Sequence, residues 1–407
     1  MVATSDLTIL RDLARRYMAV CQEPIQAERR RLWRRQNSLK GDRPLIYARA
    51  FAWAEMPDAK CLCEAPFLRS YEDFFRYRLF WDTMRDDSIF EPWVTVQATH
   101  RCQGWGIEGT RHYSDQPRGS FKMDYPLKAL GDLERLRAPW HEIDEEATAR
   151  AAQRLGDAIG DIIPVNIDRG PAYRMWTGDI SSDLGLLRGI ENFMLDMADH
   201  PEWLHRLVGF MSDGILRAHE QAEAKGDWGL CAHQNQAMPY AEELADPAAN
   251  VNGVRRAQLW GYMASQEFTL VSPAMFDEFL VQYQLPILRH FGLVAYGCCE
   301  DLTRKIGVLR QIPNLRRIAI SPFANAAKCA EQIDRDYVMS YRPSPADMVG
   351  YGFDPDRIRA ILRRDLAACR AGHVDITLKD VETVEGDRER VRKWVELTRS
   401  VVDEVFG

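Results

Sequence analysis

The residues best suited to chemistry stand at the end of one apolar run. The run GLVAYGC (292–298) leads into Cys298, Cys299, Glu300 and Asp301. A thiolate is a good soft ligand for zinc, and a carboxylate can complete the coordination shell. Because adjacent residues of a strand point to opposite faces, only one of the two cysteines is expected to face a site. The alternative is that both are small buried residues at a strand end.

Two further candidate metal ligands follow other β-rich runs. Glu267 comes after LWGYMAS (259–265), where it could bind a metal, act as a general base or cap a helix. His233 lies in CAHQNQ, and a neutral imidazole suits zinc, although a histidine in a loop is more often only hydrogen-bonded. The local chemistry therefore leaves both residues open as ligands.

Acid–base and anion-binding candidates also stand at run ends. Arg342 follows YVMSY (337–341), where its planar fork could hold a carboxylate or phosphate or form a structural ion pair. Lys379 and Asp380 follow the last β-rich run. Asp380 and Tyr296 are the candidates for acid or base.

A polar segment earlier in the chain is the candidate for substrate binding. The stretch THRCQGWGIEGTRHYSD (99–115) contains Arg101, Trp105 and His112. Side chains of these types could line a pocket and orient a small molecule. The alternative is an ordered hairpin on the surface.

Nine β-rich runs alternate with helical stretches, and this alternation predicts how the candidates are positioned. A spacing of roughly 25 to 40 residues per unit implies a parallel sheet, and about eight units favour a (β/α)8 TIM barrel. An open doubly wound sheet is the alternative, but the chain has no GxGxxG or GxxxxGK[ST] phosphate loop. One run is surplus to eight strands, and we assign 228–234 to an insertion. The runs are 44–51, 93–97, 161–167, 228–234, 259–265, 292–298, 315–321, 337–341 and 373–379.

The chain divides into residues 1–43, an N-terminal helical extension, and residues 44–407, the barrel. Residues 6–20 carry a helical apolar stripe, and the basic run after them is interpreted as a solvated helix face around Leu32 and Trp33. Proline after a short polar residue opens several later helices, as at Asp354-Pro355.

Composition excludes several classes of protein. The net charge of −7 argues against a nucleic-acid binder. No apolar run approaches the roughly 20 residues of a membrane span, and the N-terminus does not read as a signal peptide. Nine cysteines, an odd number, argue against a disulfide framework, so reduced thiols in a cytoplasm are expected.

With these residues in view, the chain resembles the uroporphyrinogen decarboxylase superfamily. The similarity is most specific over 265–322, with its Tyr-Gly-Cys-Cys-Glu strand end and its Ile-Pro-Asn-Leu-Arg segment. It extends to DLERLRAPWHEIDEEAT (132–148), ADHPEWLHRLVGFM (198–211) and the final LKD. The resemblance implies a (β/α)8 barrel and one of two chemistries.

The motifs favour the methyltransferases of that superfamily over its decarboxylases. The Arg-Gln-Ala-Gly-Arg segment that grips porphyrinogen carboxylates is absent, since this part reads ARAFAWAEM (48–56). The His-x-Cys zinc motif of the methyltransferases aligns with Tyr296-Gly297-Cys298, which keeps the cysteine and loses the histidine. Lys379 and Asp380 stand where the second cysteine is expected. Only Cys298 is therefore carried over as a family ligand.

Together these observations predict a zinc-dependent methyltransferase or demethylase for a small methylated compound. Cys298, Glu267 and His233 would hold the metal. The methyl group would pass to a corrinoid protein or to a folate, so a corrinoid or tetrahydrofolate is the expected second cofactor. One alternative is a metal-independent decarboxylase or lyase of a small acid, and another is a corrinoid- or partner-binding protein without turnover. No nucleic-acid or membrane partner is expected, and the chain could form an oligomer.

Overall fold

The computed structural model describes residues 4–49, 52–102, 104–115 and 120–407 as an α/β protein. Its main sheet has six parallel strands in the order β1-β10-β9-β8-β7-β6. Their bounds are β1 Leu45–Ala48, β6 Trp260–Met263, β7 Leu293–Tyr296, β8 Leu315–Ile320, β9 Val338–Tyr341 and β10 His373–Leu378.

Two smaller sheets accompany the main one. Strands β2 (Val94–Gln97) and β5 (Val165–Asp168) form a parallel pair. Strands β3 (Thr110–Tyr113) and β4 (Phe121–Asp124) form an antiparallel hairpin whose side chains are mostly exposed. The surface hairpin considered for 99–115 is therefore present over the second half of that segment.

Eight of the nine predicted β-rich runs contain a parallel strand, and the ninth does not. Residues 228–234 form only an isolated antiparallel bridge, between Gly229 and Asn252. The reason is that this segment instead hydrogen-bonds to the edge strand β6. The Gln234 N–H donates to the Trp260 carbonyl at 3.0 Å, and the Trp260 N–H donates to Nδ1 of His233 at 3.2 Å.

The other edge of the main sheet, at β1, is also covered by side chains. The carboxylate of Asp87 accepts the Ile46 N–H at 2.8 Å, and that of Asp86 accepts the Ala48 N–H at 2.7 Å. Carboxylates thus replace a neighbouring strand and satisfy the free backbone donors. Among the described residues, no strand pairing joins β1 to β2 or β5 to β6, so the sheet is not a closed barrel by its hydrogen bonds.

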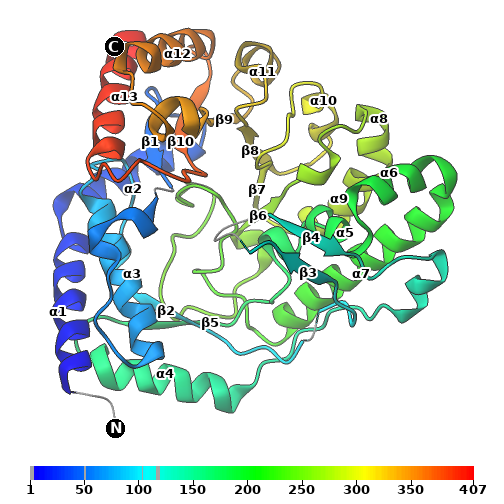
Figure 1. Cartoon of the computed structure of the whole chain (residues 1–407), viewed down its shortest axis with the longest axis horizontal. Coiled ribbons are helices and arrows are strands. Elements are labelled where there is room, and N and C mark those ends of the chain that lie inside the picture. Colours follow the sequence, from blue (N-terminus) through cyan, green and yellow to red (C-terminus); the bar gives the residue numbers. More distant parts are fainter. Residues whose placement is uncertain (1–3, 50–51, 103, 116–119) are drawn as a thin grey trace.

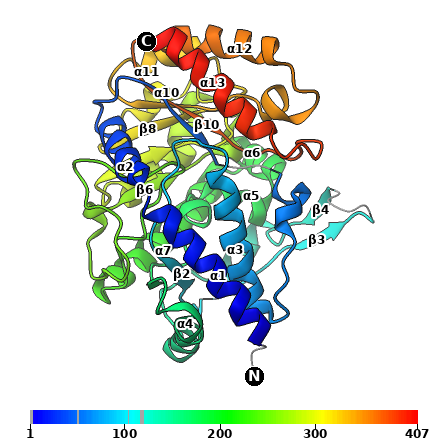
Figure 2. The same ribbon diagram turned by 90° about the vertical axis from the view of Figure 1, so that its left-hand side faces the viewer.

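Helices surround the main sheet and run beside its strands (Figures 1 and 2). Helix α12 follows the predicted start signal, since the Asp354 carboxylate accepts the N–H groups of Asp356 and Arg357 and Pro355 is the first residue. The bounds are α1 Thr4–Cys21, α2 Pro24–Asn37, α3 Pro66–Asp82, α4 Glu145–Ile159, α5 Ser181–Arg188, α6 Ile190–Asp199, α7 Pro201–Ala224, α8 Pro273–Phe276, α9 Gln282–Leu288, α10 Ile306–Leu309, α11 Ala326–Ile333, α12 Pro355–Ala368 and α13 Arg390–Phe406. Short π-helical turns cover Asp277–Val281 and Ala346–Gly350.

The N-terminal residues form α1 and α2, and α1 packs beside α3 (Figure 2). The arginines of the basic run make more contacts with the rest of the chain than the side chains of a solvated helix face would. Arg29 donates to the Ser88 carbonyl at 2.9 Å and is buried, while Arg34 pairs with Asp246 at 2.5 Å. Trp33 is fully buried, as predicted. The arginines therefore hold α2 against the rest of the chain. The division at residue 43 stays a prediction.

No helix in the described part of the chain is long and apolar enough to cross a membrane.

Candidate functional site

Cys298 belongs to a small apolar cluster that is separate from the large core. The cluster gathers residues of β6 and β7 at every second position. Tyr296, only two residues before Cys298, belongs instead to the large core that the helices share. Alternation fails between them because Gly297 has a φ of +96°. A Cβ at Gly297 would lie 2.8 Å from Leu302, so only glycine fits this turn.

The two cysteines and a lysine form one compact group, which we name the thiol centre: Cys298, Cys299, Lys379 and Asp380. The sulfur atoms lie 3.6 Å apart. The Lys379 ammonium donates to the Cys298 sulfur at 3.0 Å and to the Cys299 sulfur at 3.1 Å. It also pairs with the Asp380 carboxylate at 3.0 Å, and that carboxylate lies 3.6 Å from the Cys299 sulfur.

Curvature of the sheet brings this group together. Cys298 follows β7 and Lys379 follows β10, and β8 and β9 lie between them in the sheet. Three strand spacings amount to about 14 Å in a flat sheet. Contact at 3.0 Å therefore requires that the sheet curl, with both residues on its concave side. The carboxyl ends of parallel strands are where α/β proteins usually place their sites.

The thiol centre favours a single thiolate, on Cys298. The hydrogen bond from the Cys299 thiol is the main cause that lowers the pKa of Cys298 well below that of a free thiol, and the charges of Lys379 and Arg342 add to it against the opposing effect of burial. The bond to Cys298 and then burial raise the pKa of Cys299. Burial and Arg342 oppose the charge on Lys379, but the Cys298 thiolate outweighs them, so the pKa of Lys379 is raised.

Two buried charged side chains fix the backbone of the thiol centre. Nη1 of Arg342 donates to the Cys298 carbonyl at 2.8 Å. The Glu300 carboxylate accepts the Cys298 N–H at 2.7 Å, and its other oxygen accepts the N–H and hydroxyl of Ser265 at 2.8 and 3.0 Å. Both side chains are almost fully buried, so the loop after β7 is rigidly placed.

A polar chain approaches the thiol centre from its other side. Arg49, after β1, donates to Oε1 of Gln236 at 2.8 Å and stacks 5.3 Å from the Trp176 ring. The Gln236 amide donates to the Tyr262 hydroxyl, which donates to the Gly297 carbonyl at 3.4 Å. Burial raises the pKa of Tyr262 well above its usual value. These contacts fix the Gly297 carbonyl, directly before Cys298.

The predicted metal ligands do not gather around Cys298. Glu267 accepts the Ser181 hydroxyl at 2.5 Å, and its pKa is raised by burial and, among smaller causes, by the charges of Glu300 and Cys298. His233 caps the edge of β6, and burial lowers its pKa to about 4. Within the described ranges, no group of three or more His, Cys, Asp or Glu side chains is arranged to hold a metal ion.

The predicted catalytic residues have different positions. The Tyr296 hydroxyl donates to Gln284 of α9 at 2.7 Å, on the helix side of the sheet, so it does not face the sulfur atoms. Arg342 binds the backbone of Cys298 and acts as a positioning residue. Asp380 lies in the thiol centre, and its side chain is 61% exposed.

The predicted substrate-binding residues are likewise not one group. Arg101 is exposed and pairs with Glu142 at 3.3 Å and with Asp144 at 3.6 Å. His112 is exposed on β3, opposite Lys122. Trp105 is buried, and its indole N–H donates to Asp183 at 2.6 Å.

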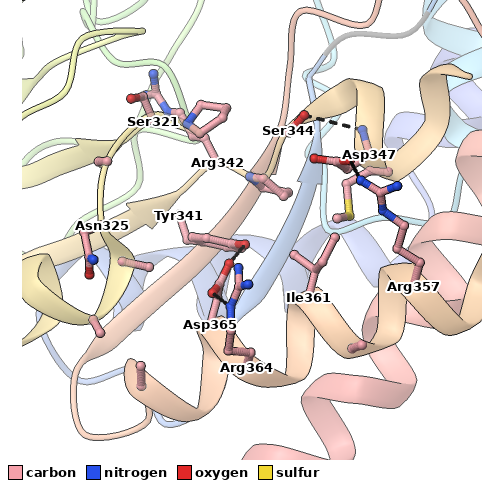
Figure 3. A pocket seen from close by; sticks show the side chains of 18 residues that line it. Ser321, Asn325, Tyr341, Arg342, Ser344, Asp347, Arg357, Ile361, Arg364 and Asp365 are labelled. Atoms are coloured by element: carbon pink, nitrogen blue, oxygen red, sulfur yellow. Dashed lines mark hydrogen bonds and ion pairs between the residues drawn. The ribbon is translucent and has the colours of Figure 1, made fainter.

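A cavity of about 830 Å³ lies outside the sheet, between α11 and α12 (Figure 3). Four of its charged side chains are paired with one another. Arg364 pairs with Asp365 at 2.7 Å, the Tyr341 hydroxyl also donates to Asp365 at 2.6 Å, and Arg357 pairs with Asp347. Arg342 also lines the cavity, but it donates to the Cys298 carbonyl and so belongs to the surroundings of the thiol centre.

Comparisons with known proteins add no assignment. No model of a known protein family matches the chain, and no curated protein matches it.

Sequence reasoning missed the role of Lys379 and the chain from Arg49 to Tyr262. Lys379 had a signal, because it stands where the resemblance implies a second cysteine. A lysine at the position of an expected metal ligand indicates that the lysine charge, rather than a metal, stabilises the thiolate. The sequence also contained a signal for Tyr262. Side chains alternate along a strand, and Tyr262 is at a position that faces away from the helices. Gln236 had none, because it lies in an irregular segment.

Proposed function

We propose that this protein is a methyltransferase in which the Cys298 thiolate takes up the methyl group of a small methylated compound. The observation that carries the proposal is the Lys379 ammonium, 3.0 Å from one sulfur and 3.1 Å from the other. The thiolate rather than the thiol is the nucleophile, so a cation held against the sulfur prepares it for attack.

We further propose that the chain is a (β/α)8 barrel of the uroporphyrinogen decarboxylase superfamily. In support, β2 and β5 pair in parallel and supply, with the six strands of the main sheet, eight parallel strands in all. The curl that joins the ends of β7 and β10 is also what a barrel requires. The position of the thiol centre after two strand ends agrees with the usual place of a barrel site.

The first half of the reaction is a substitution at carbon. Sγ of Cys298 attacks the methyl carbon, and the S–C bond forms while the bond from carbon to oxygen or nitrogen breaks. The electron pair of that bond leaves with the heteroatom. Where the leaving atom is an oxygen, Lys379 or the Cys299 thiol supplies a proton, since both already hydrogen-bond to the Cys298 sulfur.

The second half returns the thiolate. A second substrate attacks the same methyl carbon, the S–C bond breaks, and its electron pair goes back to the sulfur. A thiol of low pKa leaves more readily, so the contacts that lower the pKa of Cys298 assist this step. The resemblance implies a corrinoid protein or tetrahydrofolate as this acceptor.

The side chains present do not fit the zinc ion that the resemblance implies. The Lys379 ammonium already lies against both sulfurs and Asp380, where a second cation would be repelled. His233 is engaged at the β6 edge, and Glu267 is bonded to Ser181. The proposed mechanism therefore uses the lysine in place of a metal.

The alternative of a metal-independent decarboxylase or lyase has less support. It assigned acid–base chemistry to Tyr296 or Asp380 and the binding of carboxylates to arginines. Tyr296 is bonded to Gln284, and Arg342 holds the Cys298 carbonyl. Of these residues, Asp380 is the one exposed at the thiol centre, where it pairs with Lys379. A corrinoid-binding role without turnover would leave the lowered pKa of Cys298 without a use.

Methylation of the protein itself tests the proposal. The purified chain is incubated at pH 6 with a methyl sulfonate ester, and the methylated residue is located by tandem mass spectrometry. We expect methylation of Cys298 ahead of Cys21 and Cys369, since burial raises the pKa of both other thiols to about 12. Equal methylation of all thiols, or none at Cys298, contradicts the proposal.

Metal analysis of the same preparation separates the lysine and zinc versions. The lysine version predicts protein that is methylated at Cys298 without bound zinc. Stoichiometric zinc that disappears in Cys298→Ala would replace the lysine-activated thiolate by a zinc thiolate. Cys329→Ala is the matched control, because Cys329 is a buried thiol outside the thiol centre.

A further inference from the structure

A second cavity, of about 470 Å³, lies beneath the β3–β4 hairpin. Its walls come from the hairpin, from the loop that carries Trp105 and from α5. Its volume is within the range of small-molecule sites. The thiol centre contributes no residue to its described lining, so the cavity is a separate site.

Two aromatic rings form one corner of this cavity. The rings of Trp105 and Tyr173 meet edge to face, with centroids 5.4 Å apart and planes at 83°. The Tyr173 carbonyl is held by Nε2 of His219 at 2.6 Å. Gly104 and Gly106 take φ values of +72° and +80°, which lets the loop turn on both sides of Trp105. The corner is therefore preformed.

A carboxylate faces the same space. Oδ2 of Asp183 accepts the Trp105 indole N–H at 2.6 Å, and the described residues provide no hydrogen-bond donor for Oδ1. Burial raises the pKa of Asp183 to about 6, although the Trp105 bond lowers it and the charge of Glu267 raises it further. A carboxylate in such a place is stabilised by a cation that enters the cavity.

The rest of the lining combines apolar and charged side chains. Met123, Ile107 and Leu187 contribute side chains without hydrogen-bonding groups, and Glu108 adds a second carboxylate. Arg111 also lines the cavity, and its guanidinium stacks 5.0 Å from the Phe121 ring of the hairpin. A quaternary ammonium has no N–H groups to satisfy, and the apolar side chains of the lining can receive its methyl groups.

From this arrangement we infer that the cavity binds a methylated ammonium cation. The aromatic corner of Trp105 and Tyr173 attracts the charge, Asp183 neutralises it, and the apolar side chains receive the methyl groups. This inference does not rest on the proposed methyl transfer at Cys298. Binding of the cation is therefore expected to persist in Cys298→Ala. Failure of the proposed methyl transfer can thus be distinguished from failure of the proposed cation site.

Binding of choline and of its neutral isostere, 3,3-dimethylbutan-1-ol, tests the inference. Both are titrated into the full chain and followed by ligand-observed NMR. We expect saturable binding of choline and at least about tenfold weaker binding of the alcohol, because only the cation gains from the rings and the carboxylate. Equal affinities, or no saturation by about 100 mM choline, would overturn the inference.

Substitution of the carboxylate locates the site. Asp183→Asn keeps the shape of the side chain and should weaken choline binding at least about tenfold. Asp213→Asn, at an exposed carboxylate of α7, is the matched control and should bind choline as the native chain does. Unchanged affinity in Asp183→Asn would place the choline elsewhere and overturn the assignment. The choline–alcohol comparison on the native chain decides the case even if Asp183→Asn does not fold.

Discussion

The parallel strands carry two groups of buried charges, and the groups differ in how fully they are matched. Within the sheet, Arg317 of β8 pairs with Asp375 of β10 at 2.6 Å. Ser340 of β9 donates to the second oxygen of Asp375 at 3.0 Å, and Arg317 also donates to Asn37 of α2 at 2.8 Å. We name this group the inner ion pair. It spans β8, β9 and β10, and β8 and β9 are the two strands that lie between the sulfurs and Lys379.

The thiol centre is less evenly matched. Lys379 is shared by two sulfurs and by Asp380, and Nε of Arg342 is buried without a hydrogen-bond partner in the described residues. Asp380 takes a φ of +56°, a left-handed backbone that is uncommon for a residue other than glycine. The comparison teaches that the inner ion pair holds the curled sheet together, whereas the thiol centre keeps a thiolate ready to react.

Breaking the inner ion pair should have the largest effect on stability. Arg317→Met leaves Asp375 buried without its partner, and this should lower the free energy of unfolding by about 3–5 kcal/mol. Urea unfolding measures the loss. Arg363→Met removes an exposed pair with Glu404 and is the matched control, with an expected loss below about 1 kcal/mol. Similar losses in both variants would show that the inner ion pair is not the stronger contact.

The pH dependence of stability should distinguish the thiol centre from the inner ion pair. The unfolded chain keeps its thiols protonated below about pH 8.5, whereas the folded chain holds a Cys298 thiolate at lower pH. The unfolded state then binds more protons, so stability rises with pH between the lowered pKa of Cys298 and about 8.5, by at most about 1.4 kcal/mol per pH unit. Above this range the raised pKa of Cys299 reverses the slope.

Urea unfolding at pH 6, 7 and 8 measures this slope. The reference is Cys298→Ala/Cys299→Ala, which removes both thiols so that neither can pair with Lys379. The native chain should gain stability over this double variant as the pH rises, and the effects of buried histidines cancel in the difference. A constant difference would mean that Cys298 is a thiol in the folded chain.

Loss of the lysine should affect reactivity more than stability. Lys379→Met removes the cation from both sulfurs, and the thiolate can take up a proton, so no buried charge is left behind. Methylation of Cys298 should need a higher pH, because loss of the cation raises the pKa of Cys298, and below that pKa each further unit lowers the thiolate fraction about tenfold. The pH at half-maximal rate should rise accordingly.

Lys328→Met, at an exposed lysine, is the control for this variant and should leave the methylation rate unchanged. An unfolding free energy that falls as far in Lys379→Met as in Arg317→Met would erase the distinction between the two groups.

Much of the fold could be predicted because a strand buried on both faces leaves a continuous apolar run. Eight such runs contain strands, and Asp354-Pro355 marks the start of α12. The same logic placed Cys298 and Asp380 at the carboxyl ends of two strands of one sheet, and both do belong to the thiol centre, where Asp380 lies against the Cys299 sulfur. Residues that only have to lie at one edge of a sheet are accessible to sequence reasoning.

The direction of each side chain was not accessible in the same way. Tyr296 should share a face with Cys298 by alternation, but the positive φ of Gly297 turns Cys298 to the concave side. The contact of Lys379 with both sulfurs depends on how strongly the sheet curls across three strands. Neither the local pattern nor the composition encodes that curvature.

Substitution of His233 should have the smallest effect on stability and on methylation. It tests whether His233 has a structural role rather than a role at the thiol centre. Its Nδ1 accepts the Trp260 N–H at 3.2 Å, a bond that the amide oxygen of an asparagine can also accept. His233→Asn should therefore lower the free energy of unfolding by about 1 kcal/mol or less and leave methylation of Cys298 unchanged. His233→Ala removes the acceptor and should cost more stability, again without slowing methylation. A slower methylation in both variants, in step with loss of a bound metal, would instead make His233 the ligand that its residue type first indicated.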